Sequence, residues 1–141
     1  MTWLLDDVAQ YLETASTAYF TVGVDLTKGF MPDNPATVTT VYETGGFSSI
    51  HYFSTGAATR VFERPGVMIH SRSTSYATAR ATAFEAWRLL DGIHDRGLPT
   101  TTGTLYQSID AVQSPFEMGR DRNDRFVFSV NFTVVKSTDS P

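Results

Sequence analysis

One segment near the C-terminus constrains the fold more than any other part of the chain. Between residues 126 and 135, every second residue is large and apolar: Phe126, Phe128, Val130, Phe132 and Val134. A period of two is typical of a β-strand that buries one face. These side chains point the same way, so another layer of secondary structure must cover them.

Residues 75–95 are the expected cover. Their apolar positions recur at helical spacing and form one stripe: Tyr76, Ala79, Ala83, Trp87, Leu90 and Ile93. Gly92, Gly97 and Pro99 then favour a stop. We therefore expect a long helix at about 75–95. A second helix is expected over about residues 2–16, where apolar residues again recur at helical spacing.

The remaining segments predict strands joined by loops. Strands are expected at residues 19–26, 37–42, 67–70 and 105–112, from alternation or β-branched content. Residues 28–35 and 115–124 are interpreted as loops. Residues 47–64 show neither a helical nor a strand period. The predicted fold class is α+β: a mostly antiparallel sheet with the long helix and the N-terminal helix packed on it. We expect a single domain over residues 1–141, with a loosely held tail at 136–141.

Composition excludes several classes of function. The formal net charge is −4, which offers no basic surface for neutralising a nucleic-acid backbone. Cysteine is absent, which removes disulfides, thiolate metal sites and cysteine nucleophiles. The first residues are acidic where a signal peptide is basic, and no apolar run reaches membrane-spanning length. We expect synthesis in the cytoplasm and no membrane partner.

No pattern in the chain predicts catalysis. His51, His70 and His94 lack the short spacings of zinc sites, and the chain contains no nucleophile elbow or phosphate-binding glycine loop. Asp6 and Asp7 are interpreted as favourable charges at a helix N-terminus, with acid–base work as the weaker alternative. We therefore expect no catalytic, metal-binding or cofactor-binding residues, and no cofactor.

Several segments, taken in order, resemble the tail terminator or minor capsid proteins of long-tailed bacteriophages. The resemblance rests on residues 31–35 (MPDNP), 41–46 (VYETGG), 63–69 (ERPGVMI) with Arg72, 76–79 and 90–92, 118–121 (MGRD) with Pro115 and Arg125, and 128–132 (FSVNF). Each motif alone consists of turn and core residues, and their order and spacing carry the specificity. They span most of the chain from Met31 to Val135.

The resemblance implies a structural virion protein and no enzyme. Such a subunit forms a ring, expected to be a hexamer, that caps the tail tube and joins it to the neck. Its partners would be further copies of itself, the tail-tube protein and a neck or head-completion protein, while DNA passes through the lumen without specific binding. The alternatives are a head-completion or stopper protein, a tail-tube subunit and, more remotely, a small-ligand-binding or enzymatic domain.

A ring subunit needs different surfaces for its two neighbours. The candidate interface residues are His51, Tyr52, Phe53, Arg60 and Phe62 in the long middle segment, and Arg120, Asp121 and Arg122 in the late turn. Aromatic residues clustered outside a regular element suggest packing against another chain. Residues 120–125 alternate in charge, which fits either a solvated turn or an ion-paired interface.

Overall fold

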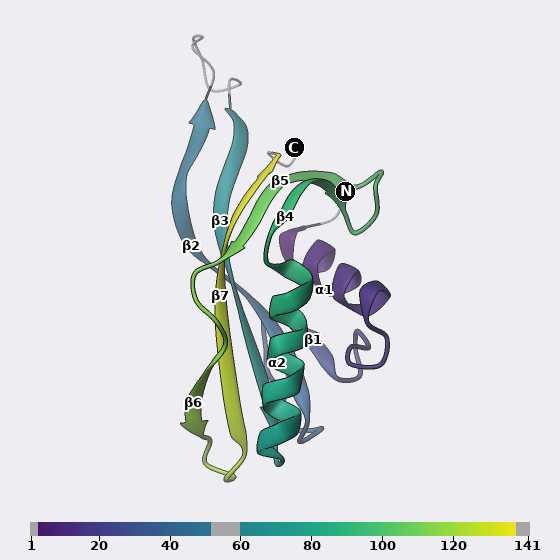
Figure 1. The fold of residues 1–141 in the computed structure, drawn as a ribbon, viewed down its shortest axis with the longest axis vertical. Coiled ribbons are helices and arrows are strands. Elements are labelled where there is room, and N and C mark those ends of the chain that lie inside the picture. Colours follow the sequence, from purple (N-terminus) through teal and green to yellow (C-terminus); the bar gives the residue numbers. More distant parts are fainter. Residues whose placement is uncertain (1–2, 52–59, 138–141) are drawn as a thin grey trace.

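The computed structural model describes residues 3–51 and 60–137 (Figure 1). Its elements in chain order are α1 (Leu4–Ala15), β1 (Leu26–Lys28), β2 (Val38–His51), β3 (Arg60–Ser73), α2 (Tyr76–Leu90), β4 (Ile93–Leu98), β5 (Thr104–Ala111), β6 (Phe116–Arg120) and β7 (Phe126–Ser137). Two 14-residue strands, β2 and β3, run the length of the molecule and set its elongated shape.

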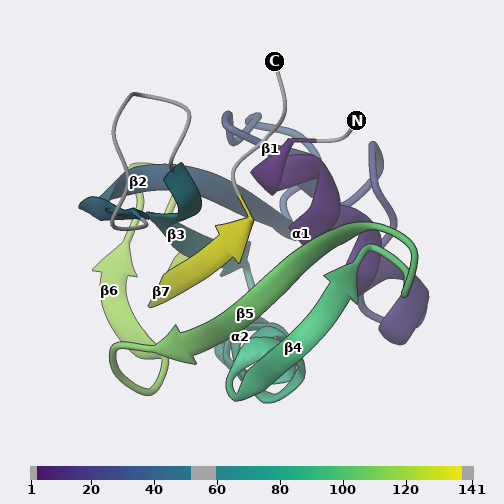
Figure 2. The ribbon, with the colours of Figure 1, turned by 90° about the horizontal axis from the view of Figure 1, so that it is seen from above.

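The described strands form one sheet in the order β1-β2-β3-β7-β5-β4, with β6 also pairing with β7. β1 and β2 are parallel, and the other pairs are antiparallel. At the centre, Ile69 of β3 lies opposite Val41 of β2 and Val130 of β7. The sheet is strongly curled, as the view from above shows (Figure 2).

The predicted fold class, α+β with a long helix at about 75–95, is wrong. In the described part of the chain, strands account for 48% and helices for 22%, so the molecule is a strongly curled, mostly β half-barrel with two short helices. α2 ends at Leu90 because the chain turns at Asp91 and Gly92, the latter at φ 87°. Ile93 continues the helical spacing, but it is the first residue of strand β4, where its side chain is buried. Spacing alone cannot distinguish an apolar residue buried on a helix from one buried on the strand that follows.

The strand predicted at residues 19–26 was wrong, and the strands predicted at residues 37–42 and 67–70 were too short. Residues 19–25 form turns, in which Thr21 N–H donates to Asp25 Oδ1 at 2.7 Å and Gly23 has φ 86°. Residues 47–64, which showed no period, contain the far halves of β2 and β3. Their alternation is broken because the pairing register shifts between Thr44 and Phe47 and again before Ile50. A Cβ at Gly46 would lie 1.9 Å from the carbonyl oxygen of Arg64, so β2 and β3 can approach this closely only at a glycine.

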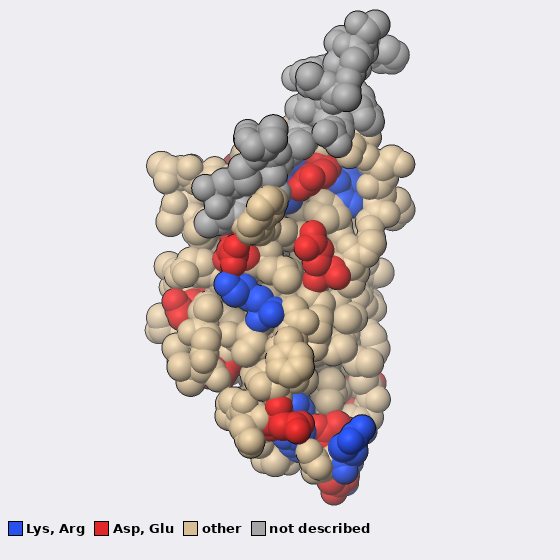
Figure 3. Space-filling model, turned by 180° about the vertical axis from the view of Figure 1, so that it is seen from behind, with Lys and Arg blue, Asp and Glu red and all other residues tan. Residues whose placement is uncertain are grey.

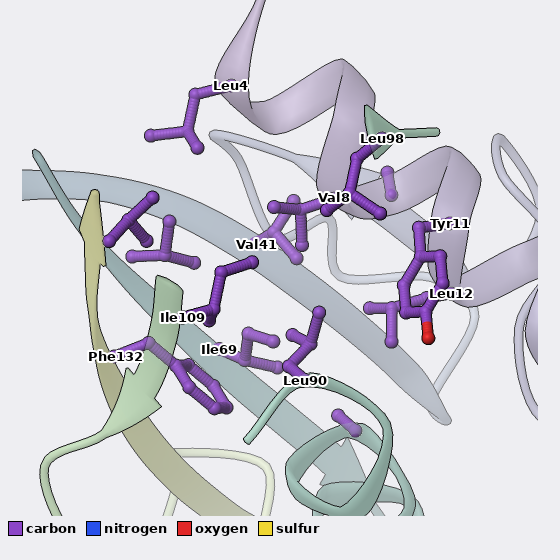
Figure 4. Packing of buried hydrophobic residues seen from close by; sticks show 14 of the residues in the cluster. Leu4, Val8, Tyr11, Leu12, Val41, Ile69, Leu90, Leu98, Ile109 and Phe132 are labelled. Carbon is purple, nitrogen blue, oxygen red and sulfur yellow. The ribbon is translucent and has the colours of Figure 1, made fainter. Parts of the chain in front are cut away.

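Both helices bury their apolar sides on the same face of the sheet (Figure 4). α1 contributes Leu4, Val8 and Leu12, and these pack with residues such as Val41 and Ile69. Each fully buried leucine contributes roughly 1.5–3 kcal/mol. This single face holds the main core.

The predicted cover over the last strand is confirmed. Ala79 and Ala83 of α2 pack directly on Phe128, and Tyr76 meets Phe126 and Phe128 edge-on at ring distances of 5.6 and 5.4 Å. Small side chains on the helix allow this close approach. β7 itself extends past the expected end, since Lys136 and Ser137 belong to it, and residues 138–141 lie outside the described residues.

A buried polar network ties α1 to the sheet. The hydroxyl of Tyr106 on β5 donates to Asp7 Oδ2 of α1 at 2.6 Å, and both residues are fully buried. Beside them, buried Lys136 donates to Glu63 at 2.9 Å and lies over the Tyr106 ring. Buried charges persist when such partners compensate for lost hydration.

Candidate functional site

A buried arginine holds the loop that connects β1 to β2. The guanidinium of Arg72, on β3, donates to the carbonyl oxygens of Pro32 (2.6 Å), Asp33 (3.2 Å), Pro35 (2.9 Å) and Ala36 (3.2 Å). Its side chain is almost inaccessible, with the residue 4% exposed. A planar fork of five donors can satisfy several carbonyls at once, as a lysine cannot. The loop is thereby fixed in one conformation.

A second arginine braces the same loop from the other side. Arg125 Nη1 donates to the Asp33 carbonyl at 2.7 Å, while its Nε donates to Asp121 Oδ2 at 2.8 Å. Asp121 also accepts from the backbone N–H groups of Asn123 and Arg125, both at 2.9 Å. Partial burial acts to raise the pKa of Asp121, but the hydrogen bonds from Arg125 and Asn123 outweigh it and hold that pKa below the ordinary value. We call Arg72, Arg125, Asp121 and residues 32–36 the arginine clamp.

The clamp brings together several of the sequence motifs on which the resemblance rests. Residues 31–35, Arg72, residues 118–121 and Arg125 are far apart in the chain, yet the fold brings them to one end of the molecule. Their role is to shape a surface, since the backbone of the loop is held from below while Asp33 points its carboxylate into solvent. Sequence reasoning missed this convergence. The available signal was that both arginines occur among the motifs: Arg72 near the end of β3 and Arg125 directly before β7.

A shallow hollow of about 320 Å³ adjoins the clamp on the sheet face that carries no helix. Its lining includes Met31, His70, Met118 and Val127. His70 packs edge-on against Tyr42 at a ring distance of 5.2 Å, and its buried Nε2 has no hydrogen-bond partner in the described part of the chain. Burial lowers the pKa of His70 from its ordinary value, which favours the neutral ring. Much of the face seen in Figure 3 is uncharged, with one cluster of charged side chains at its lower end and further charged groups across its middle and upper parts.

The late-turn candidates have distinct surroundings. Asp121 is engaged within the clamp. Arg120 pairs with Asp124 at 2.9 Å and lies 4.5 Å from the centre of the Phe126 ring. Arg122 is exposed and makes no ion pair among the residues that the structure describes. Of these three predicted interface residues, Arg122 is therefore the one whose charge is uncommitted within its own chain.

The other candidates lie toward the opposite end of the molecule (Figure 1). The backbone of His51 ends β2 and pairs in register with Arg60, which begins β3. Phe62 is half-buried and pairs with Ile50 and Ser137. Tyr52 and Phe53 lie outside the described residues. The structure thus places the predicted interface residues in two groups and does not bring them together.

No arrangement typical of a reactive site is found in the residues described. Within residues 3–51 and 60–137, no group of three His, Asp or Glu side chains could hold a metal ion. Asp6 binds Lys28 at 2.6 Å, and this hydrogen bond is the largest effect that lowers its pKa. Across the same residues, none of the helices is long and apolar enough to cross a membrane.

The curled sheet and clamped surface define a small structural subunit, and two solved structures share the fold. A protein from a structure titled as the virion of a native gene transfer agent particle superposes with a TM-score of 0.64 at 17% identity, covering 96% of this chain and 95% of its own. A second solved protein superposes with a TM-score of 0.56 at 11% identity, covering 96% and 91%.

The sequence identifies the family. A profile described as bacteriophage tail terminator protein matches residues 15–138, so the chain belongs to that family and is a structural protein of a phage virion. No curated protein matches the chain.

Proposed function

We propose that this protein caps the head-proximal end of a phage tail tube as a closed ring of identical copies and joins the tube to the neck. The observation that carries the proposal is the arginine clamp: the residues shared with the family build a fixed surface loop and no reactive cluster among the described residues. A rigid surface is what a cap requires, because ring and tube must meet in one geometry.

The two separated groups of candidate interface residues support a ring. A ring subunit contacts its left and right neighbours through different patches, and such a contact closes when its rotation divides a full turn. The lower group contains Arg122, and the described residues of the upper group, His51, Arg60 and Phe62, lie on β2 and β3. A hexamer is the ring size that the family resemblance implies. The copies would thus meet at opposite ends of the subunit.

The ring would sit between the tail-tube protein and a neck or head-completion protein, in the tail and neck of the virion. DNA would pass through its lumen without specific binding. The net charge of −4 supports this, since a basic lumen would hold the phosphate backbone and slow its passage.

A growth assay tests the proposal. Purified protein is added to tail tubes that are elongating from tail-tube subunits, and tube length is followed by electron microscopy. A cap predicts that elongation stops once each tube carries one ring. Tubes that continue to grow at saturating protein would refute the capping role, and native mass spectrometry of the same mixture reports the number of copies bound.

A further inference from the structure

The sheet has unpaired edges, and they differ in what they offer to another chain. β1 pairs with β2 only at Thr39, Thr40 and Val41, so in the described structure no strand covers β2 from Tyr42 onward. Among the described strands, β6 pairs only with β7 and β4 pairs only with β5, so each has an uncovered edge. The outer edge of the three-residue strand β1 is met by an isolated bridge from Val22. Uncovered strand edges present backbone N–H and C=O groups that can pair with a further strand.

β4 is poorly suited to accept a strand. Three consecutive ionisable residues, His94, Asp95 and Arg96, are exposed along it. Asp95 also has φ 45°, which departs from extended backbone. Charges and irregular backbone are the means by which proteins protect an edge from pairing. This leaves the edges of β2 and β6.

These two edges carry exposed apolar side chains. On β2, Phe47 is 66% exposed and Ile50 is 40% exposed. On β6, Phe116 is 41% exposed and Met118 is 54% exposed. A strand edge flanked by large exposed apolar groups is typical of a surface that is covered in an assembly. The two edges lie toward opposite ends of the molecule (Figure 1), so they cannot cover one another within a single copy.

Charge selects the direction of pairing. Glu43, at the near end of the uncovered β2 edge, is exposed and makes no ion pair among the described residues, and the same holds for Arg122 just past β6. Antiparallel pairing of the two edges brings Glu43 toward Arg122, Phe47 toward Met118 and Ile50 toward Phe116. Parallel pairing would separate both matched sets. Antiparallel pairing is therefore the complementary arrangement.

We propose that neighbouring copies of this chain join by antiparallel strand addition, in which the uncovered edge of β2 on one copy pairs with β6 on the next. The contact is heterologous, because each copy offers β2 to one neighbour and β6 to the other. The inference rests on the proposed ring, and it names the surfaces that form it.

Cysteine pairs give a direct test, because the natural chain contains no cysteine. Phe47→Cys and Met118→Cys, which lie opposite each other when Glu43 faces Arg122, are made as separate variants, mixed in equal amounts and oxidised, and sedimentation velocity records assembly in parallel. A disulfide-linked dimer is expected in the mixture, and neither variant alone is expected to form one. Val24→Cys mixed with Met118→Cys is the matched control, since Val24 is 62% exposed but lies on neither edge.

The outcomes separate this inference from the proposed function. Assembly without cross-linking above the Val24→Cys control would overturn the β2–β6 contact while leaving a ring intact. Cross-linking of Phe47→Cys with itself would show a symmetric contact and would also overturn it. A protein that remains monomeric, alone and with tail tubes, would overturn both the contact and the ring.

A charge exchange provides an independent measurement. Glu43→Arg or Arg122→Glu alone is expected to weaken assembly by about fivefold, the effect of losing one exposed ion pair. The double exchange is expected to restore it. Both side chains are exposed, so the unfolding midpoint of each variant should remain that of the natural chain. Additive weakening in the double variant would contradict the pairing direction.

Discussion

Two residues of the arginine clamp hold the loop at the lower end of the molecule through hydrogen bonds. Arg72 satisfies four backbone carbonyls, and Arg125 links the same loop to the turn after β6. The family motifs were recognisable from the sequence, but their meeting point was not. A guanidinium that bonds to carbonyl oxygens leaves no pattern of residue types at its acceptors, because every residue has a carbonyl.

Replacing Arg72 tests the clamp directly. Arg72→Met removes the donors to four loop carbonyls and should lower the free energy of unfolding by about 3 kcal/mol, since buried acceptors lose their partners. Urea denaturation measures the change. Arg122→Met is the matched control, because Arg122 is exposed and its loss should change stability by less than about 0.5 kcal/mol. Equal effects of the two substitutions would show that the clamp contributes nothing.

Asp121 gives the clamp a predictable dependence on pH. Its pKa is lower in the folded protein than the ordinary value, so its stabilising effect is complete above about pH 5 and is lost as pH falls through the lowered pKa. Asp121→Asn should therefore destabilise the protein at pH 7, and the difference from the natural chain should shrink toward pH 3. Urea midpoints between pH 7 and pH 3 measure this. A gap between Asp121→Asn and the natural chain that stays constant from pH 7 to pH 3 would contradict the assignment.

At the scale of elements, the sequence correctly predicted the strand and the helix face whose apolar residues follow one regular period. The alternation at residues 126–135 located β7, and the small residues Ala79 and Ala83 located the helix face that covers it. The far halves of β2 and β3 were missed because register shifts and the close approach of the two strands at Gly46 interrupt their alternation. Residues 19–25 were predicted as a strand because their apolar residues alternate. The segment instead forms a turn in which the Thr21 N–H donates to the Asp25 carboxylate.

A buried hydrogen bond between Tyr106 and Asp7 helps the apolar packing to anchor α1 on the sheet. Tyr106→Phe removes the hydroxyl that β5 donates to buried Asp7 and should lower the free energy of unfolding by about 1–3 kcal/mol. Hydrogen exchange in α1 should accelerate along with it, because the helix loses a tie to the sheet. Tyr19→Phe is the matched control, since Tyr19 is an exposed tyrosine on a turn. An unchanged exchange rate in α1 would mean that apolar packing alone holds the helix.

At the scale of the whole molecule, the proposed function depends on the surfaces that the core and the helices leave uncovered. The helices and the core occupy one face of the sheet, which leaves the other face, the strand edges and the clamped loop for contact with other chains. The family could be inferred from sequence because its turn and clamp residues recur in order. The candidate interface residues could not be joined into surfaces from sequence, since the uncovered edges depend on which strands pair.

Cryo-electron microscopy of tail tubes incubated with the purified protein tests the central claim most directly. The account predicts a closed ring of copies on one end of each tube, with the β2 edge of each copy against β6 of its neighbour. Bare tube ends at saturating protein, or single copies scattered along the tube wall, would contradict it.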